Sequence, residues 1–395
     1  MAHISYEKSV EILNSNLPSA QFTQKVCLQN ALNRVIAEDI IAKYDNPYMP
    51  TASMDGYAIR YEDIDKQINI IGKNPAGTFE YDSIGPGETV KTYTGSFMPQ
   101  NSDTLVPIEN VEVKGNKLII KEKVKKGFSV RPVGEDFKKG ETIIKKGTLL
   151  KPGEIGVLAS LGISVVEVIK KPVVSVISTG EEIVDLNEEY KPGQIRSSNN
   201  YTLSALSEYF GYQTYNLGIV KDNKNQIKEK IYNALKTSDI VVTTGGVSVG
   251  DFDFVKEITG EFKVLFHGVN IKPGQWIMIA KTNGKFIVSL PGFPYSSFVT
   301  FLLYVTPIAD AFENKTSLKK VSAILEEDFV KKFKKTQFVA VNLNFKNGRY
   351  YVNTKGKKQG SSGILTNLID NCAIMCLKEG LYTLNAGSEV EVIIY

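Results

Sequence analysis

One segment, TTGGVSVGDFDF at residues 243–254, combines groups that suit a phosphate ligand. It follows the apolar run Ile240–Val242, and its glycines leave main-chain N–H groups open to a bulky anion. It matches neither a Walker loop nor a dinucleotide fingerprint. Asp251 and Asp253 are hard oxygen ligands of the kind that Mg²⁺ takes beside phosphates. The alternative is that Asp251 caps a helix and Asp253 lies in its first turn.

Other short motifs carry candidate groups, each of which also fits a turn or a solvated loop. They are Asp55 in SMDGYA (53–58), Asp136 in GEDFKKGE (134–141), Glu181 and Glu182 in STGEE (178–182), Lys272 in NIKPGQ (270–275) and Gly292 in SLPGFP (289–294). Lys272 beside a Pro-Gly turn could contact a phosphate or an oxyanion. The two prolines around Gly292 fix the main chain there.

The elements around these motifs predict a parallel, doubly wound sheet. Strands are expected at 173–180, 215–220, 239–246 and 286–290, with helices at 201–212 and 225–237. Apolar strands that alternate with helices are typical of a sheet covered on both faces. Such sheets bind ligands at the carboxyl ends of their strands, which is where STGEE, TTGGVSVGDFDF and SLPGFP fall.

The rest of the chain reads differently. Residues 5–38 predict helix, with Ser5 as a cap and Leu28–Ile36 resuming the helical period after a break. Residues 68–145 alternate and turn often, which is typical of an all-β insert. After Asn314 the β alternation returns.

We therefore expect a multidomain α/β protein with a central doubly wound, mostly parallel sheet domain. A β-rich inserted domain and a small C-terminal β domain flank it. The boundaries that we predict are 1–45 plus 140–172 for a helical and extended linking domain, 46–139 for the insert, 173–318 for the α/β domain and 319–395 for the C-terminal domain.

Composition narrows the function classes. A chain of 395 residues is too long for one ordinary core, and a net charge of +4 gives no nucleic-acid footprint. The only histidines, His3 and His267, make a histidine-based metal site or triad improbable, and Cys372 and Cys376 lie in an apolar run that predicts packing. No apolar segment spans a membrane and the first residues lack an export signal, so we expect a cytoplasmic protein.

The motifs taken together, in their order, resemble the MoeA family of molybdopterin molybdotransferases and the carboxyl-terminal part of gephyrin. The resemblance covers nearly the whole chain. Its motifs are Ser53–Ala58, Gly134–Asp136, Ser178–Glu182, Gly193–Ile195 with Asn199, Thr244–Gly250 with Asp253, Ile271–Gly274 and Leu290–Gly292 with Pro294.

This resemblance implies insertion of molybdate into adenylylated molybdopterin, with Mg²⁺-dependent cleavage of the pterin–AMP bond. It also implies elongated homodimers in which the β domain of one subunit faces the cleft of the other. The implied catalytic residues are Asp55, Asp136, Asp222 and Asp253, and the implied metal ligands are Asp253, Asp222 and Glu182. The implied substrate-binding residues are Thr94, Glu182, Thr244, Gly245, Gly246, Ser248, Gly250, Lys272, Pro291, Gly292, Pro294 and Ser361.

The sequence departs from the family pattern in ways that remove positive charge. Gln275 stands where a lysine is usual, and Gln337 occupies what looks like an arginine position. Phe293, Ser289 and Ser197 replace the usual asparagine, glycine and aspartate. Gln275 could bind the ion as a neutral donor, or a lysine elsewhere, such as Lys281, could supply the charge.

Two other functions are compatible with the sequence. A molybdopterin adenylyltransferase would share the α/β domain but would not need the flanking domains. A non-catalytic molybdopterin-binding scaffold would keep the cleft for binding alone.

Overall fold

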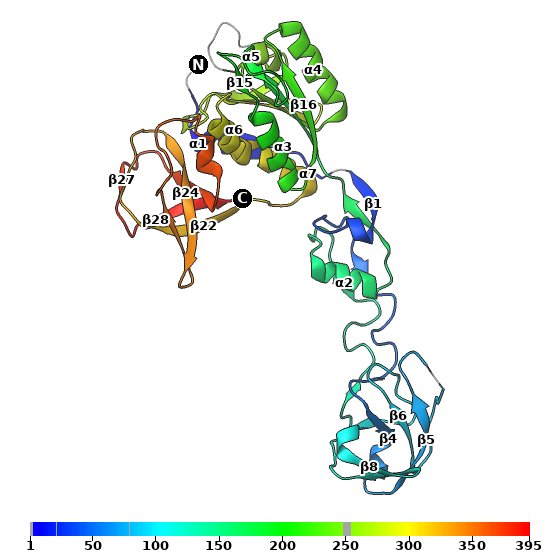
Figure 1. Cartoon of the computed structure of the whole chain (residues 1–395). Coiled ribbons are helices and arrows are strands. Elements are labelled where there is room, and N and C mark those ends of the chain that lie inside the picture. Colours follow the sequence, from blue (N-terminus) through cyan, green and yellow to red (C-terminus); the bar gives the residue numbers. More distant parts are fainter. Residues whose placement is uncertain (1–2, 21, 79, 248–253) are drawn as a thin grey trace. The chain divides into compact units, whose positions relative to one another are not determined.

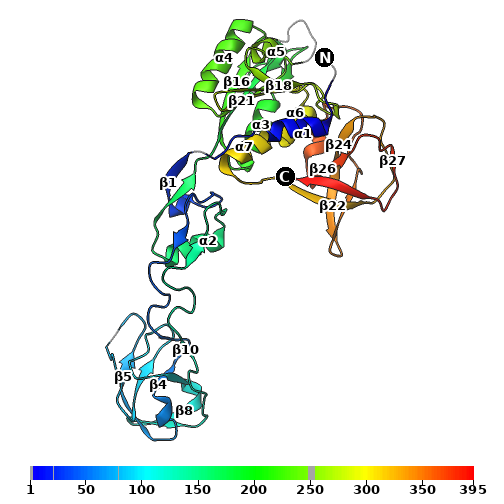
Figure 2. The ribbon, with the colours of Figure 1, turned by 180° about the vertical axis from the view of Figure 1, so that it is seen from behind.

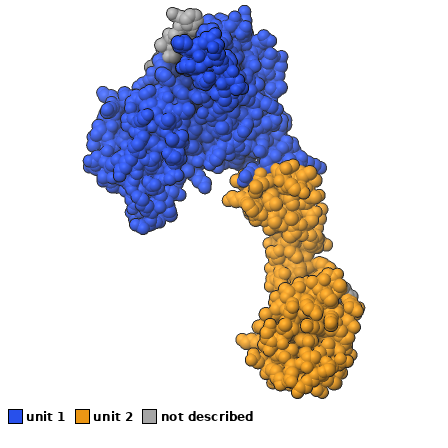
Figure 3. Space-filling view, in the orientation of Figure 1, with its two compact units in different colours: residues 1–26, 33–35, 167–395 blue, residues 27–32, 36–166 orange. Residues whose placement is uncertain are grey.

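The computed structural model describes residues 3–20, 22–78, 80–247 and 254–395 of the chain (Figure 1). They form two compact units, coloured separately in Figure 3. Unit 1 comprises residues 1–26, 33–35 and 167–395, and unit 2 comprises residues 27–32 and 36–166. Both units contain sheets and helices, which confirms a mixed α/β protein.

The first of two six-stranded sheets described in unit 1 has the strand order β16-β13-β17-β21-β20-β18. Its strands are β13 (Val173–Thr179), β16 (Gln213–Val220), β17 (Ile240–Thr244), β18 (Lys263–His267), β20 (Met278–Thr282) and β21 (Lys285–Leu290). The first four strands in that order are parallel, and β20 and β18 are antiparallel to their neighbours. Every residue of β13 and β17 is buried, as expected for strands covered on both faces.

Helices cover both faces of this sheet (Figures 1 and 2). They are α1 (Tyr6–Asn14), α3 (Asn199–Tyr209), α4 (Lys224–Thr237), α5 (Phe254–Thr259), α6 (Pro294–Thr300), the π-helical segment η4 (Phe301–Val305) and α7 (Thr306–Glu313). Helices α3, α6 and α7 pack on Val174 and Val176, and α4 and α5 pack on Ile177 and Val241. Alternate residues of one strand thus enter two separate cores.

One continuous helical run, Pro294–Glu313, is long and apolar enough to cross a membrane, but 83% of its most apolar window is buried. It includes α6, η4 and α7, whose side chains form part of the unit 1 core. The run therefore serves as a core helix.

The C-terminal part of unit 1 is a second sheet with the order β19-β24-β25-β22-β28-β26. Its strands are β19 (Ile271–Lys272), β22 (Lys319–Leu325), β24 (Thr336–Lys346), β25 (Arg349–Asn353), β26 (Cys372–Leu377) and β28 (Glu389–Ile394). Strand β24 also pairs with β26, so the last five strands close into a small barrel. Shorter elements are β14 (Ile183–Val184), β15 (Ile195–Arg196), β23 (Phe329–Val330), η5 (Leu365–Leu368) and β27 (Thr383–Leu384).

Unit 2 is built mainly on a sheet with the order β7-β4-β6-β5-β9-β8. Its strands are β4 (Gly56–Ile59), β5 (Ile68–Asn74), β6 (Glu88–Thr92), β7 (Thr104–Pro107), β8 (Val111–Lys114) and β9 (Lys117–Ile120). The remaining elements of unit 2 are η1 (Leu28–Asn30), β2 (Ile40–Ile41), β3 (Thr51–Ala52), η2 (Tyr61–Asp63), η3 (Ile108–Asn110), β10 (Val130–Arg131), β11 (Thr142–Ile144) and α2 (Pro152–Ser160). Strands β1 (Thr23–Cys27) and β12 (Val165–Ile169) pair with each other, and most of their residues belong to unit 1.

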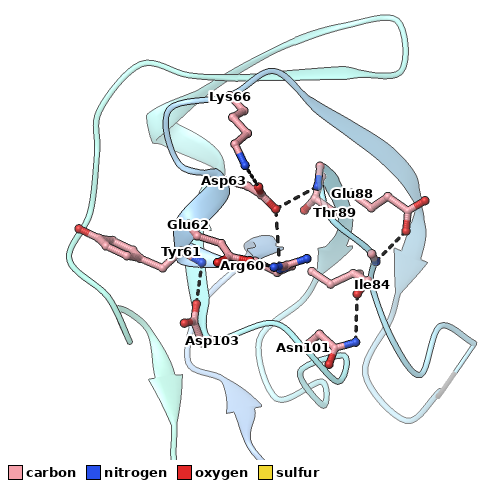
Figure 4. Close-up of polar contacts among 12 residues, drawn as sticks. Arg60, Tyr61, Glu62, Asp63, Lys66, Ile84, Glu88, Thr89, Asn101 and Asp103 are labelled. Atoms are coloured by element: carbon pink, nitrogen blue, oxygen red, sulfur yellow. Dashed lines mark hydrogen bonds and ion pairs between the residues drawn. The ribbon is translucent and has the colours of Figure 1, made fainter.

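A polar cluster in unit 2 surrounds the buried carboxylate of Asp63 (Figure 4). Asp63 accepts hydrogen bonds from the Gly87 main chain at 2.9 Å and from the Lys66 ammonium at 2.6 Å. Beside it lies a cavity of about 580 Å³, whose wall includes Arg60, Asp103 and Lys126. Three ion pairs lie in the cluster and around the cavity: Arg60 with Glu62, Lys66 with Asp63, and Lys126 with Asp103.

The sequence-based reading of the first 38 residues is half right. Ser5 caps α1 through its side chain, which accepts from the Lys8 main chain at 3.1 Å, as predicted. The helix predicted over Leu28–Ile36 is wrong. Two of its main-chain N–H groups bond to distant segments instead of to the preceding helical turn: Leu28 N donates to Ser164 O, and Ile36 N donates to Thr148 O. Asn33 has a φ of 60°, which is not helical.

The predicted packing role of Cys372 and Cys376 is confirmed. Both lie in β26, are half-buried and pack against the core of unit 1, and neither forms a disulfide. Burial raises the pKa of both thiols, so they stay protonated at neutral pH.

Candidate functional site

The carboxyl ends of β13 and β17 are tied together by hydroxyl groups. The Thr244 side chain is buried, and its Oγ1 lies 2.9 Å from Ser178 Oγ. Ser178 Oγ donates to Asn200 Oδ1 at 2.6 Å, which connects both strands to α3. This network holds the start of the glycine segment in a fixed position.

Gly245 and Gly246 follow with φ values of 91° and 64°, which few residues other than glycine adopt readily. A Cβ at Gly245 would lie 2.6 Å from the Thr179 carbonyl oxygen, and one at Gly246 would lie 3.0 Å from Val255. At these two positions the need for glycine comes from the protein's own packing. The sequence pattern alone had indicated close approach of a ligand.

Gly292 differs, because among the described residues a Cβ there would meet only Gly245 Cα, at 3.7 Å. The Gly292 carbonyl accepts a hydrogen bond of 2.8 Å from the Asn199 side chain. On its other side Phe293 is 63% exposed, and Pro294 begins α6. The described residues thus leave room at Gly292 for a ligand to approach the main chain.

A cavity of about 360 Å³ lies beside this segment, and we call it the oxyanion cavity. Its wall includes Pro291, Ser296, Trp276 and Phe333, together with the side chains of Lys272 and Lys335. No carboxylate is among the described residues that line it. One water molecule occupies roughly 30 Å³, so a tetrahedral oxyanion fits with room to spare.

The two lysines of the oxyanion cavity repel each other. Burial and the charge of Lys335 lower the pKa of Lys272 from its ordinary value. The Lys272 ammonium lies 3.2 Å from the centroid of the Phe333 ring, and the Lys335 ammonium donates to Gln275 Oε1. Both cations are thus held by neutral groups, which leaves their charge available to an anion.

A smaller cavity of about 40 Å³ adjoins the first and shares Lys272 with it. Gln337, Lys358 and Ser361 also line it, and Ser361 Oγ accepts from the Gly363 main chain at 3.2 Å. Gln337 Oε1 is buried and has no hydrogen-bond partner within the part of the chain that the structure describes. The predicted Lys272 and Ser361 are therefore brought together.

Two of the predicted acids of unit 1, Glu182 and Asp222, follow the ends of β13 and β16. Asp222 Oδ2 accepts from the Glu181 main chain at 3.2 Å. Burial raises the pKa of Asp222, and the negative charges of Glu182 and Glu181 raise it further. Lys221 does not neutralise the group directly, because its ammonium donates to the main-chain carbonyls of Glu181 and Ile183.

This arrangement fits a divalent cation in the chemistry of its donors. Carboxylates held near one another without a counterion are the usual setting for Mg²⁺ beside phosphates. Within residues 3–247 and 254–395, apart from the gaps at 21 and 79, no group of three His, Cys, Asp or Glu side chains is placed to hold a metal ion. Asp222 and Glu182 would need further ligands.

Two predicted residues of unit 2 form a pair. Asp55 Oδ1 accepts from both the main chain and the hydroxyl of Thr94, each at 2.8 Å. These hydrogen bonds, the main-chain bond first, lower the pKa of Asp55 below its ordinary value. Asp136 lies elsewhere in unit 2, where its Oδ2 accepts from the Asn46 side chain at 2.9 Å.

Four residues with predicted roles, Ser248, Gly250, Asp251 and Asp253, lie outside the described residues. Their roles in substrate and metal binding stay predictions.

The sequence reasoning missed Lys335, Trp276 and Phe333. The alternative that Lys281 supplies the missing charge is not favoured, because its ammonium donates to the Asn16 carbonyl at 2.7 Å and Lys281 does not line the oxyanion cavity. The only sequence signal was the basic run Lys331–Lys335, which is interrupted by Phe333. That run reads as a solvated strand end, and its connection to Gln275 is not visible from local pattern.

Comparison with known proteins covers the same regions. The MoeA N-terminal region (domain I and II) matches residues 4–162, a probable molybdopterin binding domain matches 175–311, and the MoeA C-terminal region (domain IV) matches 322–395. The molybdopterin molybdenumtransferase of Staphylococcus aureus is 34% identical over 93% of this chain and 90% of its own. That of Haemophilus influenzae is 32% identical over 95% of each.

A solved structure gives the same result at the level of the fold. The molybdopterin biosynthesis moeA protein from Pyrococcus horikoshii matches with a TM-score of 0.84 and 30% identity over 100% of both chains. The similarity therefore includes the α/β domain and also the regions on either side of it. The chain belongs to the MoeA family.

Proposed function

We propose that this chain is a molybdopterin molybdenumtransferase, which inserts molybdate into adenylylated molybdopterin and releases AMP. The observation that carries the proposal is the oxyanion cavity, with two lysines and no described carboxylate, beside Pro291 and Phe293 after the end of β21. The names of the relatives support the same activity.

In this proposal residues 173–318 act as the doubly wound molybdopterin-binding domain. The pterin and its phosphates lie along Gly292, where the main chain is open, and along the segment that Thr244 begins. Asn199 holds the Gly292 carbonyl, so the main chain stays in one conformation as the ligand arrives. Such preorganisation lowers the entropy that binding costs.

Mg²⁺ belongs to the proposal through Glu182, Asp222 and Asp253. When bound, the ion offsets charge on the pyrophosphate and on the departing AMP. The carboxylates of the chain hold the metal ion and orient the substrate. They do not act as covalent nucleophiles in this proposal, since nucleophilic catalysis needs an activated side chain. Lys272 binds the molybdate oxygens beside the pterin, and Pro291 and Pro294 keep the intervening loop rigid.

The metal part is testable by substitution. Asp222→Asn should raise the Mg²⁺ concentration that gives half-maximal AMP release by about tenfold or more, since even partners of metal ligands are worth that much. Asp253→Asn should abolish molybdate-dependent release, because an amide cannot supply the charge. Glu189→Gln, at an exposed position, is the matched control. Unchanged turnover in Asp253→Asn would remove Asp253 from the site.

A homodimer is a further part of the proposal. The resemblance gives Asp55 and Thr94, both in unit 2, a role at a site built largely by unit 1 residues. Mixing inactive Asp55→Ala protein with inactive Asp253→Ala protein should restore activity through hybrid dimers. If subunits exchange and no activity returns, each site is made within one chain.

One assay separates the proposal from its alternatives. Purified protein is incubated with adenylylated molybdopterin, Mg²⁺ and molybdate, and AMP is followed. Molybdate-dependent AMP release supports the proposal. ATP consumption with free molybdopterin indicates an adenylyltransferase. The absence of both reactions indicates a binding scaffold. Cytoplasmic location stays a prediction.

A further inference from the structure

We propose that Lys335 is the second cation of the oxyanion cavity, and that Gln275 orients it. The inference rests on the proposed function, because molybdate is the anion that the cavity would take. It assigns the charge that the sequence lacks at position 275 to a lysine 60 residues further along the chain.

Strand pairing brings Lys335 to the cavity. Strand β19 pairs with β24 in parallel, with Ile271 opposite Thr336 and Lys272 opposite Gln337. Thr336 N also bonds to Asn270 O at 3.2 Å. Lys335 directly precedes this ladder, so its position relative to Lys272 is fixed by the main chain.

The charges around the cavity favour an anion. Lys272 and Lys335 both line it, and the pKa of Lys272 is lowered by burial and by Lys335. Lys335 also helps to lower the pKa of His3, whose ring packs edge-on against Trp276 with centroids 4.6 Å apart. Two like charges held in one cavity disfavour each other, and an anion bound between them would offset that repulsion.

Gln275 has a role that a lysine could not fill. Its Oε1 accepts a hydrogen bond from the Lys335 ammonium, and a lysine has no acceptor atom. Gln275 therefore holds Lys335 at the cavity, where a lysine at 275 would compete with it. In this proposal Lys335 supplies the cation in place of a lysine at position 275, and Gln275 is its hydrogen-bond partner.

Two other lysines are excluded from this role by their contacts. Lys281 donates to the Asn16 carbonyl and does not line the oxyanion cavity. Lys358 lines only the smaller cavity, next to Ser361. Lys334, the sequence neighbour of Lys335, is exposed and does not line either cavity, which makes it a matched control.

The chain carries its own probe for this site. Trp276 is the only tryptophan in the sequence, and it lines the oxyanion cavity. Intrinsic fluorescence titrated with molybdate, and separately with sulfate, therefore reports binding in this cavity. Equilibrium dialysis with molybdate provides a second measurement that does not depend on the fluorescence change.

The decisive variants exchange the two side chains. Lys335→Gln should weaken molybdate binding by about tenfold to a hundredfold, the worth of one charge-assisted hydrogen bond. Lys335→Arg should keep most of the affinity, because it keeps the charge. The double variant Lys335→Gln/Gln275→Lys should recover most of the loss, and Lys334→Gln should bind like the wild type.

The opposite results would overturn the inference. Unchanged binding in Lys335→Gln would show that Lys335 is not a ligand, and equal losses in Lys335→Gln and Lys334→Gln would indicate a diffuse charge effect. Absence of rescue by Gln275→Lys, with melting temperatures unchanged, would contradict the exchange of roles. AMP release by the wild-type protein tests the proposed function separately, because it can persist when Lys335 proves unimportant.

Discussion

The oxyanion cavity of unit 1 and the cavity beside Asp63 in unit 2 differ in the groups that contact their cationic side chains. In the oxyanion cavity of unit 1, Lys272 and Lys335 contact a phenyl ring and an amide oxygen. In the cavity of unit 2, Arg60 pairs with Glu62, and the Lys126 ammonium lies 3.2 Å from Asp103. The unit 2 cavity is the larger of the two, at about 580 Å³ against 360 Å³.

The pKa shifts show that the charged form of Asp103 is favoured in the unit 2 cavity, whereas the charged form of Lys272 is disfavoured in the oxyanion cavity. Burial by itself would raise the pKa of Asp103, but hydrogen bonds from Tyr61 and Thr104, with Lys126 nearby, lower it below its ordinary value. The lowered pKa of Lys272 instead means that its charged form is disfavoured. The volume of a cavity therefore does not identify a binding site. A charged side chain without a counterion does, because a bound ligand can supply the opposite charge.

The largest expected effect comes from removing both free cations. The double variant Lys272→Gln/Lys335→Gln should lose more than about a hundredfold in molybdate affinity, because each charge-assisted hydrogen bond is worth about 1.5–3 kcal/mol. Arg60→Gln/Lys126→Gln, the matched change in unit 2, should leave the affinity unchanged. Fluorescence titration of Trp276 measures both. Equal losses in the two variants would erase the distinction between the cavities.

The next effect concerns stability. Asp63→Asn should lower the free energy of unfolding of unit 2 by about 1–3 kcal/mol, because the amide cannot accept from both Gly87 and Lys66 as the buried carboxylate does. Lys335→Gln should cause no such loss, since it relieves repulsion. Hydrogen exchange followed by mass spectrometry, read peptide by peptide, localises each change. A destabilised Lys335→Gln would contradict the idea that its charge is held for a ligand.

A smaller effect is the pH dependence of anion binding. Lys272 has a lowered pKa in the free protein, and a bound anion raises it, so affinity is full at lower pH and falls as pH rises through the free-protein value. His3, whose pKa is lowered by burial and by Lys335, is neutral across this range. Sulfate titrations between about pH 7 and 10 cover the window below the usual lysine pKa.

In the Lys335→Gln variant the fall should move to higher pH, since the repulsion that lowers the Lys272 pKa is removed. A fall at the same pH as in the wild type would show that burial alone sets the Lys272 pKa.

The smallest effect is the response to salt. Raising ionic strength from about 0.1 to 1 M shortens the screening length from about 10 Å to 3 Å, so molybdate affinity should fall by a few-fold. The melting of unit 2 should change little, because the Asp63 and Asp103 carboxylates also accept main-chain hydrogen bonds. Calorimetric melting and fluorescence titration at the same salt concentrations compare the two. Affinity that is independent of salt would argue for binding by neutral donors.

Much of the α/β region could be predicted because its signals are local. The apolar run at 173–179 forms β13, and the amphipathic pattern at 225–237 forms α4 almost to the residue. A strand buried on both faces must be apolar throughout, which is a pattern visible in the sequence alone. The Leu28–Ile36 segment failed for the converse reason. Its apolar spacing also fits short extended pieces whose hydrogen-bond partners, at Thr148 and Ser164, lie more than a hundred positions away.

The family motifs, the strand ends that carry them and the glutamine at position 275 can all be recognised in the sequence alone. The tertiary structure decided which groups meet. It brought Lys335 to Gln275 through the β19–β24 pairing, paired Asp55 with Thr94, and assigned Gly245 and Gly246 to internal packing. The physical reason is that strand pairing and register depend on burial summed over distant segments, so no local pattern around Gln275 or Lys335 contains their contact.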